Sequence, residues 1–295
     1  MAAIRHQSIL SCLVFATFAA LCTSSLLGQD GIVGIVGRRT LLQWSGSTEE
    51  GGPPGFDEPL ASDRPDFVEA SVTVGRGVRQ LEMGYTYISD KSTNLSAHSF
   101  PEILFRTGVW ADWLELRLGL NFGSTTEGFD PLTRGVGGAE DLYLGVKLGL
   151  TAQDGILPEM SIVPQFTVPT GQAELSTHQV HAGVNWLYGW DINEFLSLGG
   201  STQANMGLDD ETNRDFVEFA QAFTIGYTLT EKWGAYTEWF VIAPAGAASI
   251  RTQHYLDGGF TYRVTNNLQL DVRAGNGVSA ASDNFFVGSG AVVRW

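Results

Sequence analysis

Strict alternation of apolar and polar residues is the feature that most constrains this chain. In residues 113–122 (WLELRLGLNF), leucines and a phenylalanine occupy every second position, and Glu115 and Arg117 stand between them. Side chains of a β-strand point alternately to opposite faces, so such a strand has one apolar and one polar face. Residues 141–151 repeat the pattern, with Lys147 on the polar face. When segments of about ten residues repeat it with aromatic residues near their ends, the pattern is typical of a transmembrane β-barrel.

Alternating segments follow one another from residue 78 to the C-terminus. We predict strands at residues 78–88, 99–109, 113–122, 141–151, 159–168, 179–190, 195–206, 216–229, 232–242, 253–264, 268–276 and 284–295. The connections alternate between short turns and longer polar loops; one connection on the short side, 152–158, is longer. Outer-membrane barrels have an even number of strands, short periplasmic turns and longer extracellular loops. The sequence therefore predicts an all-β fold, a transmembrane antiparallel β-barrel of about 12 strands over residues 78–295.

A soluble β-sandwich is the alternative fold, because it would also contain many alternating strands. Its polar face would carry many lysines and glutamates in contact with water. Here the polar face is rich in Gly, Ser, Thr and Gln with scattered charges. Trp and Tyr near the strand ends favour the membrane interface, where such residues are enriched. The composition therefore favours the barrel.

The chain that precedes the predicted barrel has two parts. Arg5 and His6, an apolar run at residues 9–21 and small residues at 23–25 are typical of a secretory signal peptide. We assign residues 1–28 to it, with cleavage between about residues 22 and 30; a retained anchor helix is the alternative. Both cysteines of the chain lie inside this part, so the mature protein is expected to lack thiols. Residues 29–77 are expected to form a periplasmic N-terminal linker and lead-in segment, because Gly, Pro and acidic residues are frequent there.

Charge and motifs exclude several classes of function. The net charge of −15 argues against a nucleic-acid partner, which would require a basic patch. The glycines of residues 135–138 (GVGG) are not followed by a predicted helix, so they do not form a phosphate-binding loop. The sequence contains no pattern of metal ligands. We therefore predict no metal and no cofactor.

The inward faces of the strands are the only place for chemistry in such a barrel. The predicted register puts the following ionisable side chains in the lumen: Glu82, Glu102, Glu115, Asp141, Glu218, Glu238, Asp257 and Asp271, with Arg106, Arg117, Lys147, His181, Arg263, Arg273 and Arg294. Facing lipid at the bilayer midplane, an Arg or Lys would cost about 2–4 kcal/mol. One interpretation is a network of ion pairs that fills a narrow barrel, and the other is a pore whose charged constriction selects solutes. For the pore we predict that Arg106, Arg117 and Arg273 lie opposite Glu115, Glu102 and Asp271.

A lipid hydrolase of the outer membrane is one alternative function, and a structural or adhesive barrel is another. Some outer-membrane barrels are phospholipases with a Ser/His pair on the lipid-facing wall. Here His98, His178 and His254 fall at loop edges and His181 falls on a polar face. The predicted register places no Ser beside a His on an apolar face. We therefore predict that the protein is not an enzyme.

Two segments resemble a known family, and the C-terminus resembles a wider class. Residues Asp63, Arg64, Pro65, Asp66 and Phe67, followed by Glu69, resemble the DRPD-type motif of the outer-membrane transporters named for the MetA pathway of phenol degradation. Residues 80–87 (QLEMGYTY) resemble the first barrel strand of that family. The last residues, 292–295 (VVRW), resemble the terminal strand of outer-membrane proteins, and its aromatic residue, Trp295, is the expected signal for the barrel-assembly machinery. Where the family usually has Thr-Glu-Ser after the motif's aspartate, this chain has residues 67–70 (FVEA).

The resemblance spans roughly residues 61–295. It implies a channel in the cell outer membrane for passive uptake of small organic solutes, aromatic or hydrophobic compounds among them. It implies no catalytic residues. The partners that we expect are outer-membrane lipid, the barrel-assembly machinery and a small-molecule solute.

Overall fold

The computed structural model describes residues 37–43, 51–90, 95–127, 137–209 and 211–295. The predicted signal peptide, residues 1–28, lies outside the described residues. Residues 39–295 form one compact unit, and its regular secondary structure is all β where the structure describes it. None of the described residues belongs to a helix that is long and apolar enough to cross a membrane.

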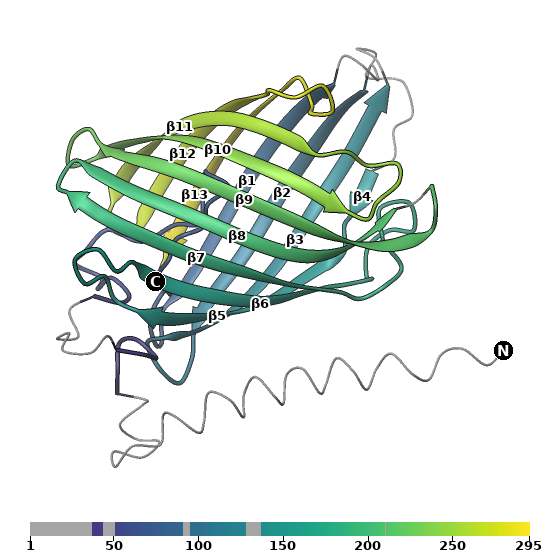
Figure 1. Cartoon of the computed structure of the whole chain (residues 1–295). Helices are drawn as coiled ribbons and strands as arrows, with labels where there is room; N and C mark the ends of the chain where they lie inside the picture. The colour runs from purple at the N-terminus through teal and green to yellow at the C-terminus, as the bar shows by residue number, and fades with distance from the viewer. Residues whose placement is uncertain (1–36, 44–50, 91–94, 128–136, 210) are drawn as a thin grey trace. The chain divides into compact units, whose positions relative to one another are not determined.

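Twelve long strands form a closed antiparallel barrel, shown in Figure 1. The strands are β1 (Arg79–Asp90), β2 (Leu95–Gly108), β3 (Leu114–Glu127), β5 (Leu142–Thr151), β6 (Glu159–Val168), β7 (His181–Asn193), β8 (Leu196–Asp209), β9 (Arg214–Thr228), β10 (Trp233–Ala245), β11 (Gln253–Thr265), β12 (Leu268–Gly277) and β13 (Phe285–Arg294). Each pairs with the next one along the chain, and β1 also pairs with β13, which closes the barrel. A short strand, β4 (Gly137–Ala139), pairs with the end of β3. The predicted all-β barrel of about 12 strands is confirmed.

The two faces of the strands differ as the sequence pattern predicts. On β3, Leu116 and Leu118 are 44% and 43% exposed, whereas Glu115 and Arg117 are 0% and 3% exposed. The exposed leucines therefore form part of the outer wall, and the charged residues face the lumen. The same alternation holds on β12, where Val272 is exposed and Asp271 is buried.

Several strands continue beyond their predicted ends, mostly away from the short turns; β7, which runs to Asn193, extends into one. In the hairpin of β2 and β3, pairing extends to Leu95 opposite Glu127, past the predicted ends at residues 99 and 122. Strand β4 arises because Gly137 and Ala139 pair back onto Ser124 and Phe122. The sequence analysis placed this stretch in the long loop between the predicted strands 113–122 and 141–151.

The two ends of the barrel are distinct. We call the end with the short turns and the C-terminus the turn end, and the opposite end the loop end. At the turn end, the backbone of Trp295 exchanges two hydrogen bonds of 2.9 Å with Arg79, so the last residue fastens β13 to the start of β1. The loop end carries the longer connections, such as the one between β6 and β7.

The structure differs from the sequence analysis most in the segment before β1. Residues 29–77 were expected to form a periplasmic N-terminal linker and lead-in segment, and the structure places residues 60–74 of this part inside the barrel. Leu60, Asp63, Val68 and Val74 are buried, and side chains from the inward faces of the strands bind this stretch. We call residues 60–74 the inner segment. Burying a charged group away from water is costly unless a group of opposite charge pairs with it. The inner segment can lie in the lumen because its charged side chains have such partners there.

Candidate functional site in the barrel lumen

The inner segment rises from the turn end, bends back inside the lumen and returns to the turn end before β1. At its start, the amide of Leu60 donates to the carbonyl of Asn266 in the turn between β11 and β12. At its tip, the amides of Phe67 and Val68 donate to the carboxylate of Glu238 at 2.7 and 2.9 Å. On the way back, the hydroxyl of Thr73 donates to the carbonyl of Asp112, in the turn between β2 and β3. Both ends of the inner segment are therefore attached to turns of the barrel, and its tip at Phe67 and Val68 lies deeper in the lumen.

Asp63 is the centre of the ion pairs that hold the inner segment. Its carboxylate lies 3.2 Å from Arg106, 2.5 Å from Arg117 and 3.0 Å from Lys147. These cations come from β2, β3 and β5, three neighbouring strands of the wall. Burial alone would raise the pKa of Asp63, but the three cations hold the pKa of its carboxyl well below its ordinary value. The charge of Asp63 is thus shared among the three strands.

The cations around Asp63 also bind carboxylates of the wall. Arg106 pairs with Glu115 at 2.7 Å and with Glu82 at 3.0 Å. Arg117 pairs with Glu69 of the inner segment at 3.0 Å and with Glu115 at 3.2 Å. Buried ion pairs of this kind add little net stability when complete, but the loss of one partner is costly because it leaves a buried charge uncompensated. These ion pairs around Asp63 therefore specify the position of the inner segment in the lumen.

Arg64 corrects part of the predicted charge pairing. The sequence analysis placed Glu102 and Asp271 opposite arginines of the wall, but both bind Arg64 of the inner segment, at 3.0 and 3.2 Å. Arg273 instead donates to the carbonyl of Pro65 and to the hydroxyl of Thr86. The guanidinium of Arg64 fits against the wall because glycine stands at positions 84 and 290, where a β-carbon would collide with it. The predicted pairing of Arg106 with Glu115 is present.

The structure therefore divides the predicted lumen residues into two groups. Those in the wall around the inner segment are Glu82, Glu102, Arg106, Glu115, Arg117, Lys147, Glu238, Asp271 and Arg273. The other predicted lumen residues are Asp141, His181, Glu218, Asp257, Arg263 and Arg294, of which Asp257 lies near Asp66 of the inner segment. Of the four motif residues, Asp63 and Arg64 form ion pairs, Pro65 accepts from Arg273, and Asp66 lies among carboxylates.

Some of the second group have structural roles at the barrel ends. Asp141 accepts from the amides of Gly171 and Thr177 and so binds the loop after β6, rather than a partner in the central lumen. Arg294 donates to three carbonyls of residues 54–58, the stretch that leads to the inner segment. Arg263 lines a pocket of about 220 Å³ at the turn end, together with Leu60.

A group of carboxylates surrounds the tip of the inner segment. Glu238 on β10 lies directly opposite Asp257 on β11, and Tyr236 donates to Asp257 at 2.9 Å. Burial, together with the nearby carboxylates of Asp257 and Asp63, raises the pKa of Asp66 to about 7. Acceptor oxygens therefore outnumber cations on this side of the lumen. Among the residues that the structure describes, no group of three or more His, Asp or Glu side chains is arranged to hold a metal ion.

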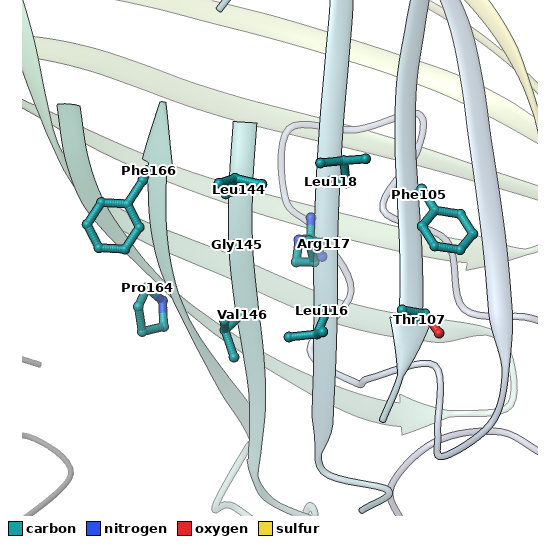
Figure 2. A pocket seen from close by; sticks show the side chains of 10 residues that line it. All are labelled: Phe105, Thr107, Leu116, Arg117, Leu118, Leu144, Gly145, Val146, Pro164 and Phe166. Atoms are coloured by element: carbon teal, nitrogen blue, oxygen red, sulfur yellow. The ribbon is translucent and has the colours of Figure 1, made fainter. Parts of the chain in front are cut away.

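A second hollow lies in the outer wall, not in the lumen. Figure 2 shows this pocket of about 430 Å³ across β2, β3, β5 and β6, lined by apolar side chains such as Leu118, Leu144 and Phe166. The pairing of β5 with β6 stops at Gly145 and resumes at Leu148, and Pro164 lies in the gap. Proline has no amide hydrogen to donate to a neighbouring strand, which explains the interruption. Because the exposed leucines line it, this pocket belongs to the lipid-facing surface.

The sequence analysis missed the role of Asp63, Arg64 and Glu69 as lumen residues. Alternation cannot find them, because they lie outside any strand. Two signals were present: the apolar pair Phe67 and Val68 within a charged stretch, and the many glycines on the inward faces of the strands. Glycine on an inward face leaves room for a second layer of chain.

Lys147 provides a test of how the inner segment is held. Replacing it with methionine removes two hydrogen bonds, to Asp63 and to the carbonyl of Ala70. A hydrogen bond to a charged group contributes about 1.5–3 kcal/mol, so we expect Lys147→Met to expose the segment at least about tenfold more often. Thermolysin cleavage near Phe67, measured in folded protein, reports that exposure. The exposed Lys232 is the matched control, and equal cleavage rates in Lys147→Met and Lys232→Met would contradict the assignment.

The comparison with known proteins decides the family. The model of the family described as "Putative MetA-pathway of phenol degradation" matches residues 62–295, which include every barrel strand and all of the inner segment except its first two residues. The chain belongs to this family. The predicted resemblance to the MetA-pathway family is thereby confirmed. No curated protein sequence matches the chain.

Several solved outer-membrane proteins are similar to the chain at low sequence identity. The outer membrane channel of the COG4313 type from Pseudomonas putida F1 has a TM-score of 0.61 and 15% identity, with 79% of this chain and 99% of that chain covered. The NanC porin has a TM-score of 0.48 and 11% identity, with 73% and 98% covered. The CymD monoaromatic hydrocarbon channel has a TM-score of 0.40 and 11% identity, with 75% and 88% covered. The barrel fold of this MetA-pathway family protein is thus similar to that of the Pseudomonas putida outer membrane channel.

Proposed function

We propose that this MetA-pathway family protein is an outer-membrane channel through which small organic solutes pass passively, and that the inner segment closes its lumen. The observation that carries the proposal is the inner segment itself, a separate stretch of chain held inside the barrel. Its contacts are ion pairs and hydrogen bonds to strands around the lumen, from Glu102 on β2 to Glu238 on β10 and Asp271 on β12.

The size of the barrel supports a passage once the segment moves. Eight strands give an interior that side chains fill, whereas porins of 16–18 strands leave an aqueous channel. The twelve long strands of this barrel place it between these limits. Its wall carries inward glycines, such as Gly84 and Gly290, that leave space next to the inner segment. Departure of the inner segment would therefore leave an open lumen with charged walls.

The polarity of the site supports organic rather than strongly charged solutes. With the inner segment in place, Arg106, Arg117 and Lys147 each form an ion pair with a carboxylate. The barrel also shares its fold with the outer membrane channel from Pseudomonas putida F1, and the family is described by the degradation of phenol, an aromatic compound.

Location and assembly complete the proposal. Outer-membrane lipid is expected to contact the exposed leucines of the wall, and the barrel-assembly machinery is expected to read Trp295. Trp295 is 49% exposed at the turn end, where its ring remains accessible. We propose that the turn end faces the periplasm, as in other outer-membrane barrels, and that residues 1–28 are removed on export.

Liposome swelling tests the function directly. Proteoliposomes with the full barrel are expected to swell in small neutral solutes faster than protein-free liposomes. Release of free fatty acid is measured in the same vesicles, because hydrolysis of the vesicle lipid would indicate the alternative function, a lipid hydrolase. A barrel that folds, as shown by heat-modifiable migration, but admits none of the solutes would be a structural barrel and would overturn the proposal.

A further inference from the structure

Four aromatic rings meet inside the lumen, at the tip of the inner segment. Phe240 on β10, Tyr255 on β11 and Phe286 on β13 are buried on inward-facing positions, with Ala222 and Val68 packed against them. The fourth ring is Phe67 of the inner segment. Interiors of outer-membrane barrels are polar as a rule, so an aromatic cluster in the lumen calls for a specific explanation.

The geometry of the cluster is that of a binding site for a flat ring. Phe67 stacks on Phe240 with ring centroids 4.6 Å apart and an interplanar angle of 3°. Tyr255 stacks on the same Phe240 ring at 4.8 Å and 17°. Phe286 packs against Tyr255 edge-on, with centroids 6.1 Å apart at 65°. Phe67 is therefore held as a ligand ring would be, by stacking on one side chain of the wall.

Phe67 differs from the other three rings in the part of the chain to which it belongs. Phe240, Tyr255 and Phe286 belong to the barrel strands, whereas Phe67 belongs to the inner segment, which must leave the lumen if solutes pass. When it leaves, the stacking face of Phe240 loses its partner. The space that remains is bounded by the three wall rings, with Ile88 and Ile242 next to them.

The polar groups beside the cluster define what a replacement ring must carry. Both oxygens of Glu238 accept from the amides of Phe67 and Val68, so departure of the tip frees two acceptors. Asp257 lies opposite Glu238 on the neighbouring strand, and its Oδ1 has no hydrogen-bond partner among the described residues. A nearby cation, Arg273, lies 5.5 Å above the ring of Phe286 and donates hydrogen bonds to Pro65 and Thr86. A ring with a donor is favoured, and a negatively charged ring is repelled by the carboxylates.

We propose that the place of the Phe67 ring is a binding site for a single aromatic ring that carries a hydroxyl or amine donor and no negative charge. A bound ring replaces Phe67 on Phe240, takes up the acceptors of Glu238 and so favours departure of the inner segment. This inference rests on the proposed function, because it assumes that the inner segment moves. It adds the ligand class and a means by which the ligand opens its own path.

Competition between the ligand and Phe67 has a measurable consequence. A site that is open only part of the time binds with an affinity reduced by its open fraction. Removing the Phe67 ring deletes one stacked aromatic pair, an interaction that corresponds to about a two- to twelvefold change in an equilibrium. Phe67→Ala should therefore bind a donor-bearing ring about two- to twelvefold more tightly than the wild type. Phe240→Ala also frees the segment but removes the stacking face for the ligand, so it should bind the ring about two- to twelvefold more weakly than Phe67→Ala does.

Fluorine NMR of para-fluorophenol, with the full barrel in liposomes, measures this binding. The two variants are a matched pair, because both delete one ring of the same stack and both should loosen the inner segment. We expect tighter binding in Phe67→Ala than in the wild type and in Phe240→Ala, and no binding of para-fluorobenzoate to any of the three proteins. Heat-modifiable migration of each variant confirms that the barrel is folded.

The outcomes separate this inference from the proposed function. Equal para-fluorophenol binding in the wild type, Phe67→Ala and Phe240→Ala would overturn the site, because the cluster would then only pack the segment. If swelling in small solutes persisted at the same time, the channel function would stand. Selective binding without swelling in any solute would support the site and overturn the channel. Faster swelling of wild-type vesicles after para-fluorophenol is added, and no such change in Phe240→Ala, supports both.

Discussion

Replacing Asp63 with asparagine is expected to turn a mostly closed barrel into an open one. The substitution keeps the size of the side chain but removes the charge that Arg106, Arg117 and Lys147 share. Glu82 and Glu115 remain to neutralise part of the cationic charge of the wall, so the barrel itself should still fold. The inner segment, in contrast, loses the group at which three strands hold it.

The size of this effect follows from the burial of the cluster. Breaking a buried ion pair by removal of one partner costs about 3–5 kcal/mol. If this cost falls on the closed state, the ratio of open to closed barrels rises about 100-fold or more. Planar-bilayer recordings of Asp63→Asn should show a larger conductance and more frequent openings than the wild type.

Asp57→Asn is the matched control for this experiment. Asp57 precedes the inner segment and is exposed, and the substitution removes the same charge from the chain. Its conductance should equal that of the wild type. Equal conductance in Asp63→Asn and Asp57→Asn, with both proteins folded, would show that the ion pairs of Asp63 do not hold the lumen closed.

The sequence predicts the barrel because alternation reports directly on which face of a strand meets lipid. At Leu116 and Leu118 the pattern places the side chains on the outer wall, and it places Glu115 and Arg117 in the lumen, where the structure has them. Strand ends are less certain from sequence, because pairing in a hairpin can continue through residues of low strand propensity. Ser124 and Gly137 pair in this way where the sequence analysis expected a loop.

The candidate site was only half predictable, for a physical reason. Charges on strands can be assigned to the lumen, because lipid excludes them. Their partners cannot be assigned when those partners lie on a stretch without periodicity. Glu102 and Asp271 were correctly expected to face the lumen, but nothing in their spacing shows that Arg64 lies between them. Aromatic residues at inward positions, such as Phe240 and Phe286, carry a further signal, because polar residues usually occupy such positions.

The central claim is that solutes pass only when the inner segment leaves its place. A tether between Ser71 on the segment and Gly189 on β7 tests it. A β-carbon added at Gly189 would lie 3.9 Å from the β-carbon of Ser71, and disulfides join β-carbons about 3.5–4.5 Å apart. The variant with Ser71→Cys and Gly189→Cys should therefore form a disulfide that fastens the segment to the wall. Each single variant is the control for the effect of the substitutions alone.

Swelling of proteoliposomes with this double variant, oxidised and then reduced, is the decisive measurement. The oxidised double variant should exclude solutes that the wild type and both single variants admit, and a reductant should restore swelling to the rate of the single variants. Unchanged swelling in oxidised protein whose disulfide has been verified by mass spectrometry would contradict the account, because solutes would then pass a barrel whose inner segment cannot leave.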